Sequence, residues 1–259
     1  MNPTLLGLLA VLGMLLGMIV VLEAGRQLGA RRLAKDPESA KAGTAAIEGA
    51  VFGLMALLIA FTFSGAASRF DARRGLVIEE ANNIGTAWLR LDLLPAAAQP
   101  PLREKFRQYV DARLAFYAKL PDVEAALGEL AQATGLQNEL WKEAVAACRD
   151  SGSSSASMLL LPALNQMIDI TTTRTMAART HAPLTVYAML GLLVLAGSLL
   201  AGYSMASGKT HNWFHNFAFA LIMALAIYVI LDFEFPRVGL IRLNAFDQAL
   251  VDVRHSMNP

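Results

Sequence analysis

The sequence has 259 residues, of which 55% are hydrophobic and only 17% are charged. A soluble domain of this length does not need so much apolar material, so the composition favours a membrane protein. The formal net charge of +1 gives no field that would attract nucleic acid, and the single cysteine, Cys148, excludes a disulfide within the chain.

Four long apolar segments are predicted to cross a membrane as helices. They cover about 5–24, 45–67, 184–206 and 216–232. A hydrocarbon core of about 30 Å requires about 20 helical residues at about 1.5 Å each, so all four segments have a suitable length. Their apolar runs are continuous and do not alternate every second residue, which indicates helices rather than the strands of a barrel.

The first apolar segment has the position of a signal peptide but lacks its other features. No basic residue precedes it in the stretch from Met1 to Thr4, and no small-x-small cleavage site follows it. We therefore predict that it is a retained anchor.

A short basic loop, 25–44, connects the first two spans. Its basic residues are Arg26, Arg31, Arg32, Lys35 and Lys41. Short loops of this kind stay in the cytoplasm, so we predict that this loop faces the cytoplasm from a bacterial inner (plasma) membrane. The opposite orientation remains open, because arginines also flank the spans on the other side.

The region between the second and third spans is predicted to be helical, because it is rich in Ala, Leu, Glu, Arg and Gln. The second span meets no proline before Pro95, so it is expected to continue as a stalk beyond the membrane. Further helices are predicted over 102–120, 122–133, 137–149 and 158–180, with a flexible Gly/Ser loop at 151–155.

These elements predict an all-α, polytopic membrane protein. Its parts are a first transmembrane hairpin (1–67), an extramembrane helical stalk and bundle (68–182), a second transmembrane hairpin (183–235) and a short C-terminal tail (236–259).

The densest polar pattern lies along the second span and its continuation. Seven hydroxyl, amide or charged side chains there are candidates for an ion pathway: Thr62, Ser64, Ser68, Glu79, Asn83, Thr86 and Arg90. The last four follow one another at helical spacing and share a face, which in an oligomer becomes a ring around a water-filled pathway. The alternative is a polar seam within one bundle, in which Glu79 or Glu80 pairs with Arg90 or a neighbour.

Other polar residues are expected to be structural. Four charged residues are predicted at the membrane interface: Glu48, Asp232, Glu234 and Arg237. His211 and His215 have a spacing that can bind zinc, but no third ligand accompanies them, so an aromatic belt is favoured over a metal site. No nucleotide-binding, hydrolase or Cys/His metal motif occurs, so we predict neither an enzyme nor a cofactor.

Three sequence blocks resemble a known family. They are Leu58–Arg74 (LIAFTFSGAASRFDARR), Glu80–Pro95 (EANNIGTAWLRLDLLP) and Asp232–Leu240 (DFEFPRVGL). All three are similar to blocks of the bacterial membrane family of bestrophin-like proteins, and the resemblance covers essentially the whole chain. It implies four spans with a helical insert and kinship with bestrophins, which are oligomeric calcium-gated anion channels. The sequence has neither the acidic calcium-clasp run nor the aromatic neck motif of true bestrophins, so channel residues are not carried over one by one.

The resulting functional prediction is an oligomeric bacterial membrane ion channel or channel-like protein, with anions implied by the resemblance and a pore lined by the second span and its extension. Expected partners are the lipid bilayer, further copies of the chain and inorganic ions, but not nucleic acid. The alternative is a membrane sensor or scaffold subunit whose helical domain binds a partner or ligand. A membrane metalloenzyme is a third hypothesis and rests on His211 and His215 alone.

Overall fold

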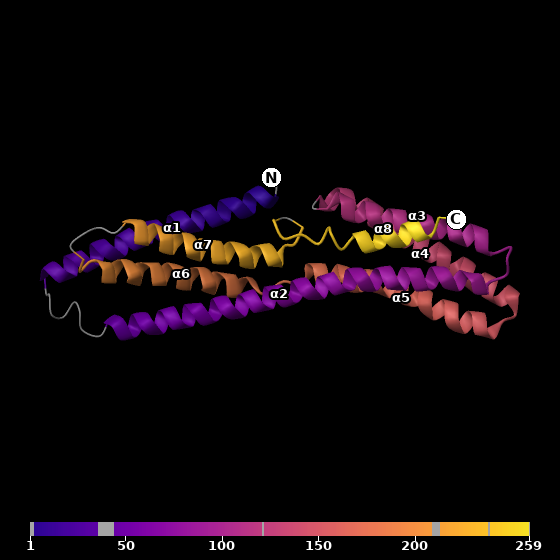
Figure 1. Cartoon of the computed structure of the whole chain (residues 1–259), viewed down its shortest axis with the longest axis horizontal. Coiled ribbons are helices and arrows are strands. Elements are labelled where there is room, and N and C mark those ends of the chain that lie inside the picture. The colour runs from indigo at the N-terminus through magenta and orange to yellow at the C-terminus, as the bar shows by residue number, and fades with distance from the viewer. Residues whose placement is uncertain (1–2, 36–43, 121, 209–212, 238, 259) are drawn as a thin grey trace. The chain divides into compact units, whose positions relative to one another are not determined.

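The computed structural model describes residues 3–35, 44–120, 122–208, 213–237 and 239–258. Within these ranges the regular structure is helical, and no strand occurs (Figure 1). The chain divides into two compact units. We call Met1–Arg69 with His181–Leu240 the membrane unit, and Phe70–Thr180 with Ile241–Pro259 the bundle unit. The fold is therefore the predicted one, a polytopic all-α protein with a helical insert between its second and third spans.

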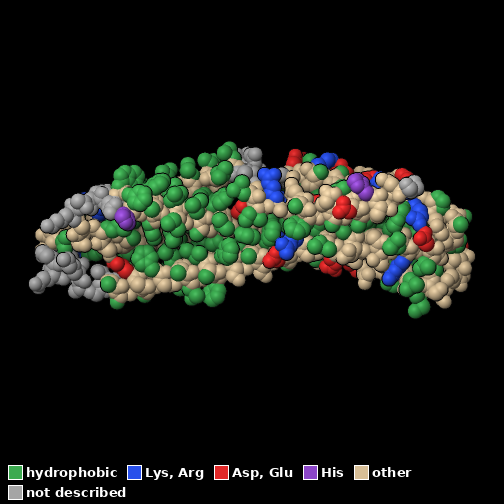
Figure 2. Space-filling view, viewed as in Figure 1, with side chains coloured by type: hydrophobic (Ala, Val, Ile, Leu, Met, Phe, Trp, Pro, Cys, Tyr) green, Lys and Arg blue, Asp and Glu red, His purple; other side chains and the backbone are tan. Residues whose placement is uncertain are grey.

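The membrane unit contains α1 (Pro3–Lys35), the first part of α2 (Thr44–Arg90), α6 (Leu184–Met205) and α7 (Trp213–Glu234). Among the described residues, four helices are long and apolar enough to cross a membrane, which confirms the four predicted spans. Figure 2 shows hydrophobic side chains gathered over α1 and α7, as expected for surfaces that contact lipid.

Helix α1 is longer than the predicted span and continues into the segment expected to be a loop. No proline interrupts it after the apolar run, and its last turn carries Arg32 and Lys35. Basic side chains at this end interact favourably with the helix dipole. The helix therefore ends at Lys35 rather than near residue 24.

Close packing of α1 against α6 depends on glycines. A Cβ atom on Gly25 would lie 2.1 Å from the carbonyl oxygen of Leu199, and one on Gly202 would lie 1.9 Å from the carbonyl oxygen of Leu22. No side chain fits at either position. Membrane helices use such small residues because lipid tails are as apolar as leucine and the two helices must gain their attraction from close contact.

Helix α2 is held differently within the membrane unit. In the described part of this unit, its backbone does not pack closely along α1, α6 or α7. It makes contact through large side chains instead: Phe52 meets Phe219 edge-on at 6.3 Å between ring centroids, and Phe63 meets Phe233 at 5.5 Å. On another side of α2, Leu57 and Phe61 are left exposed by the described residues.

The bundle unit contains the rest of α2, the short 3-10 helix η1 (Leu91–Leu93), α3 (Gln99–Lys119), α4 (Val123–Ser151), α5 (Ser154–Arg179) and α8 (Gln248–Ser256). Its core is apolar and includes Ile84, Phe106, Leu140 and Leu164, each at most 1% exposed. The predicted continuation of the second span is present as the continuous 47-residue helix α2, and its position beyond the membrane stays a prediction.

One predicted break between helices is absent from the structure. The expected interruption at Thr134–Gly135 does not occur, because one glycine costs a helix only about 1 kcal/mol and the core of the bundle offsets this. The chain turns later, at Gly152, whose φ of 61° ends α4 in the left-handed conformation. Ser153 then caps α5 by accepting a hydrogen bond from the backbone N–H of Ala156.

The segment expected to be a C-terminal tail contains a packed helix. Leu250 of α8 is completely buried, and Met257 is 1% exposed. Arg254 pairs with Asp111 of α3, with 2.7 Å between Nε and Oδ1. The bundle unit thus includes a C-terminal element that is far from the rest of the unit in sequence.

Candidate ion pathway

The seven pathway candidates differ in how far their side chains are exposed and in which side of α2 they occupy. Ser64, Ser68 and Glu79 are exposed in the single chain, and Thr86 is half-buried. On an α-helix these four residues lie within one sector, because they are spaced by multiples of about three to four residues. They form the exposed stripe of α2.

Thr62 lies on the opposite side of α2 and is only 8% exposed. Its hydroxyl donates to the carbonyl oxygens of Leu58 at 2.7 Å and Ile59 at 3.0 Å. A hydroxyl that donates to its own helix in this way has its hydrogen-bond donor satisfied, so it can lie against a neighbouring helix.

Asn83 and Arg90 point to the side of α2 and contact α5. The Asn83 amide donates to the carbonyl oxygen of Gln166 at 3.4 Å, and Arg90 Nη1 donates to that of Leu159 at 2.6 Å. The predicted face of Glu79, Asn83, Thr86 and Arg90 is therefore divided. Two of its members attach α2 to the bundle, and two remain accessible.

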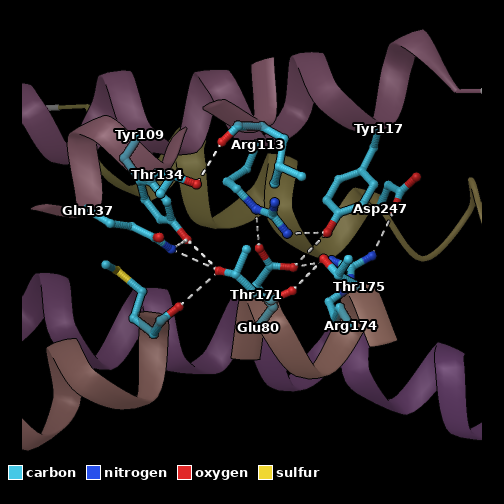
Figure 3. A network of polar contacts seen from close by, with 12 residues as sticks. Glu80, Tyr109, Arg113, Tyr117, Thr134, Gln137, Thr171, Arg174, Thr175 and Asp247 are labelled. Atoms are coloured by element: carbon cyan, nitrogen blue, oxygen red, sulfur yellow. Dashed lines mark hydrogen bonds and ion pairs between the residues drawn. The ribbon is translucent and has the colours of Figure 1, made fainter. Parts of the chain in front are cut away.

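The strongest electrostatic feature of the bundle unit is centred on Glu80, the neighbour of the exposed Glu79 (Figure 3). Glu80 is completely buried, and its Oε1 accepts from Arg113 Nε at 2.6 Å. Its Oε2 accepts from Arg174 Nη1 and from the Tyr117 hydroxyl, the latter at 3.1 Å. One carboxylate of α2 is thus bonded to both α3 and α5.

Aromatic and polar neighbours complete this buried cluster. The Arg174 guanidinium lies 4.1 Å from the ring centroid of Tyr117, a cation–π distance. Beside it, the Gln137 amide of α4 donates to the hydroxyls of Tyr109 at 3.2 Å and Thr171 at 2.9 Å (Figure 3). All four long helices of the bundle therefore contribute to one polar network.

The ionisable groups of this network keep their usual charges: the glutamate is negative, the arginines are positive and the tyrosine is neutral. Burial alone would raise the pKa of the Glu80 carboxyl, but Arg113 and Arg174 hold that pKa below its usual range. Burial would likewise lower the pKa of Arg113, whereas Tyr117 and Glu80 raise it above its usual value. Burial and Glu80 together raise the pKa of Tyr117, which stays neutral. The network is therefore an ion cluster with one buried anion between two cations.

Sequence reasoning did not find the partners of Glu80. The available signal was the spacing of Tyr109, Arg113 and Tyr117, which places an arginine between two tyrosines on one face of α3. That arginine lies on the buried side of α3 and is 1% exposed. Arg174 gave no comparable signal, because its partners come from other helices.

A second ion cluster lies within the membrane unit, at Glu234 near the end of α7. Glu234 is completely buried, and Arg69 of α2 approaches both of its carboxylate oxygens, with 2.6 Å between Nη2 and Oε2. His181 Nδ1 lies 3.0 Å from Oε1, and the imidazole stacks on Phe235 at 4.7 Å. This carboxylate, which the sequence predicts at the membrane interface, therefore links α2, α7 and the segment before α6.

The remaining interfacial candidates have local roles. Asp232 is 5% exposed and accepts the backbone N–H of Leu240 at 2.9 Å. A Cβ atom on Gly239 would lie 1.2 Å from its carboxylate oxygen, so glycine is required where the chain folds over Asp232. Glu48 accepts a hydrogen bond from the Ser204 hydroxyl, and Arg237 is half-buried.

The histidine pair gives no metal site in the part of the chain that the structure describes. His215 is exposed near the start of α7, and His211 lies outside the described residues. Among the described residues, no group of three His, Cys, Asp or Glu side chains is arranged to hold a metal ion.

Comparison with known protein families identifies the family that this chain matches. A family model for the Bestrophin-like domain matches residues 17–245, which is most of the chain. The chain belongs to the bestrophin-like family. No curated protein matched the chain.

Several solved structures share this fold. A membrane protein carrying a single substitution matches with a TM-score of 0.71 and 16% identity, over 96% of this chain and 98% of that one. A bestrophin homologue from Klebsiella pneumoniae carrying a single substitution matches with a TM-score of 0.68 and 16% identity, over 95% and 98% of the two chains. A further structure of the Klebsiella pneumoniae homologue matches with a TM-score of 0.67 and 15% identity, over 93% of this chain and 98% of that one. At these identities the likeness establishes the fold, and the chain is a multi-pass membrane protein of bestrophin-like architecture.

Proposed function

We propose that this protein is an oligomeric ion channel of the bacterial inner membrane, with a pore lined by the exposed stripe of α2. The observation that carries the proposal is the position of Ser64 and Ser68, which are exposed in the single chain at the end of a membrane span. Polar side chains within membrane spans face the interior of an assembly or a water-filled cavity rather than lipid.

The packing of the membrane unit supports an assembly of several copies. Helices α1 and α6 approach each other closely through glycines, whereas α2 contacts its own chain mainly through long side chains. Exposed apolar residues, including Leu57 and Phe61, precede the two serines on the same side of α2. Copies arranged around a closed symmetry axis would bring these stripes together and leave the outer helices in contact with lipid.

The Glu80 cluster supports the same proposal by fixing the orientation of α2. A pore-lining helix must present one face to the ions, and rotation by one residue would turn that face by about 100°. Glu80 cannot leave Arg113 and Arg174 without exposing three buried charges, so α2 is held with Glu79 on its accessible side. Family membership adds weight, because the bestrophins after which the family is named are channels.

The proposal is tested with purified full-length protein in planar bilayers. We expect single-channel currents, an oligomeric mass in detergent, and a reduced unitary conductance in Ser64→Trp. Leu192→Trp, on an exposed position of α6, is the matched control and should conduct like the wild type. A monomer with silent bilayers under varied voltage, pH and calcium would overturn the proposal.

A further inference from the structure

One side of α1 carries exposed apolar residues that lead directly into exposed basic ones. Its apolar members follow one another at spacings of four residues: Leu16, Val20, Ala24 and Leu28. Three and four residues after Leu28 come Arg31 and Arg32, and Lys35 follows by another turn, all of them exposed. Such spacings keep side chains on one side of a helix. We call these seven residues the α1 stripe.

Close packing places the end of α1 beside the end of α6. A Cβ atom on Gly17 would lie 3.8 Å from the Leu195 side chain. One on Gly29 would lie 2.5 Å from the carbonyl oxygen of Tyr203. The two helices therefore run in the same direction, and α6 ends two residues after Tyr203, at Met205. Because the basic residues of the α1 stripe begin two residues after Gly29, they lie at the level where α6 ends (Figure 1).

This end of the membrane unit has the residue types of a membrane surface. Helix α7 begins here after a short connection from α6, and its Trp213 and Phe214 are 59% and 77% exposed. Exposed aromatic rings at the end of a span are typical of the level of the lipid headgroups. The basic residues of the α1 stripe are therefore placed at headgroup level, and its apolar residues are placed at the level of the hydrocarbon.

The three cations of the α1 stripe form no ion pair within the part of the chain that the structure describes. Carboxylates at this end of the unit bind other groups. Glu23 pairs with Arg26, with 2.8 Å between Oε1 and Nη2, and Glu48 accepts from the Ser204 hydroxyl. The sequence from 25 to 44 contains five basic and two acidic residues, so its net charge is +3. The end of the α1 stripe therefore offers positive charge to a partner.

We propose that the α1 stripe is a binding site for an anionic phospholipid, with the headgroup at Arg31, Arg32 and Lys35 and an acyl chain along Leu28 and Val20. Guanidinium and ammonium groups form charge-assisted hydrogen bonds to phosphate oxygens, and basic residues next to a span attract anionic lipids. A free phosphate would use the cations alone, whereas a phospholipid also uses the apolar part of the stripe. The site does not depend on ion conduction.

The test measures lipid binding to the detergent-purified full chain by native mass spectrometry. Phosphatidylglycerol and phosphatidylcholine with the same acyl chains are titrated separately, so that the headgroup alone differs. We expect the wild type to bind phosphatidylglycerol more tightly, and Arg31→Gln/Arg32→Gln should lower this preference by about tenfold. Lys142→Gln/Arg149→Gln removes two exposed charges from α4 in the bundle unit. It is the matched control and should keep the preference.

Three results would overturn the proposal. Equal affinities of the wild type for the two lipids would mean that the stripe does not select an anionic headgroup. An unchanged preference in Arg31→Gln/Arg32→Gln would place the anionic lipid elsewhere. Displacement of bound phosphatidylglycerol by equimolar glycerol phosphate would show that the cations bind a phosphate without its acyl chain.

A second variant tests the position of the acyl chain. Leu28→Gln keeps all three cations, so it should weaken the binding of both lipids by about threefold and leave their ratio unchanged. Leu93→Gln, at an exposed leucine of the bundle unit, is its control and should bind both lipids as the wild type does. A Leu28→Gln variant with wild-type affinities would contradict the proposed path of the acyl chain.

Discussion

The two units hold α2 by different kinds of contact. In the membrane unit, helices meet through glycines and aromatic edges, and their charges lie toward the helix ends, as Glu234 does. In the bundle unit, the same helix is fixed by a buried carboxylate between two arginines. The difference agrees with the prediction that the bundle unit lies outside the membrane. Burial gives membrane helices no hydrophobic gain over lipid, so their packing depends on shape, whereas a bundle in water has that gain and can use charge to fix the register of its helices.

Glu80→Gln should show the largest effect, because it leaves Arg113 and Arg174 buried without their anion. We expect a loss of about 3–5 kcal/mol in the free energy of unfolding, measured by denaturant titration of the detergent-purified full chain. The adjacent Glu79→Gln should change it by less than about 0.5 kcal/mol. Equal effects would show that the buried cluster does not stabilise the bundle unit.

The pH dependence of stability should report the same carboxylate. The pKa of Glu80 in the folded protein lies below the unfolded glutamate value of about 4.3. Its contribution is therefore complete above that value and is lost as the pH falls through the lowered folded pKa. Wild-type stability should fall more steeply on acidification than that of Glu80→Gln. Parallel profiles would contradict the assignment.

In the membrane unit, adding a single methyl group should lower stability where two helices are in close backbone contact. Gly25→Ala places a Cβ atom against the backbone of α6, and we expect a loss of about 1–3 kcal/mol in an SDS unfolding titration. Gly13→Ala, in the same helix but with nothing within 4 Å of its Cβ position, is the control and should be neutral or slightly stabilising. A neutral Gly25→Ala would mean that α1 and α6 do not pack this closely.

The smallest expected effect concerns the turn between α4 and α5. Ser153→Ala removes the hydroxyl that accepts the Ala156 N–H, which should cost about 1 kcal/mol in the same denaturant titration. Ser155→Ala removes an exposed hydroxyl that lies 3.0 Å from that of Ser153 but keeps the acceptor of the Ala156 N–H, so it should cost less. A cost shared equally by both variants would argue against the cap.

The spans were predictable because each is an apolar run that only a membrane helix explains, and α2 because no proline interrupts it before Pro95. The continuous α4 was missed because Gly135 looks like a break unless the core that holds the helix is known. Helix α8 was missed because its nine residues carry a weak pattern and are anchored by Leu250 and Arg254 against a distant helix.

The candidate site was predictable only as a list of polar residues on one helix. Spacing alone could not tell the buried Glu80 from the exposed Glu79, because their environment is set by Arg113 and Arg174 from other helices. For the same reason, it could not show that Thr62 faces inward while Ser64 faces outward.

Cysteine accessibility tests most directly whether the exposed stripe of α2 lines an ion pathway. In planar bilayers, Ser64→Cys channels should lose current when a water-soluble methanethiosulfonate is added, and Leu192→Cys channels on α6 should not. Modification of Ser64→Cys that leaves the current unchanged, with the reaction verified by mass spectrometry, would contradict the account.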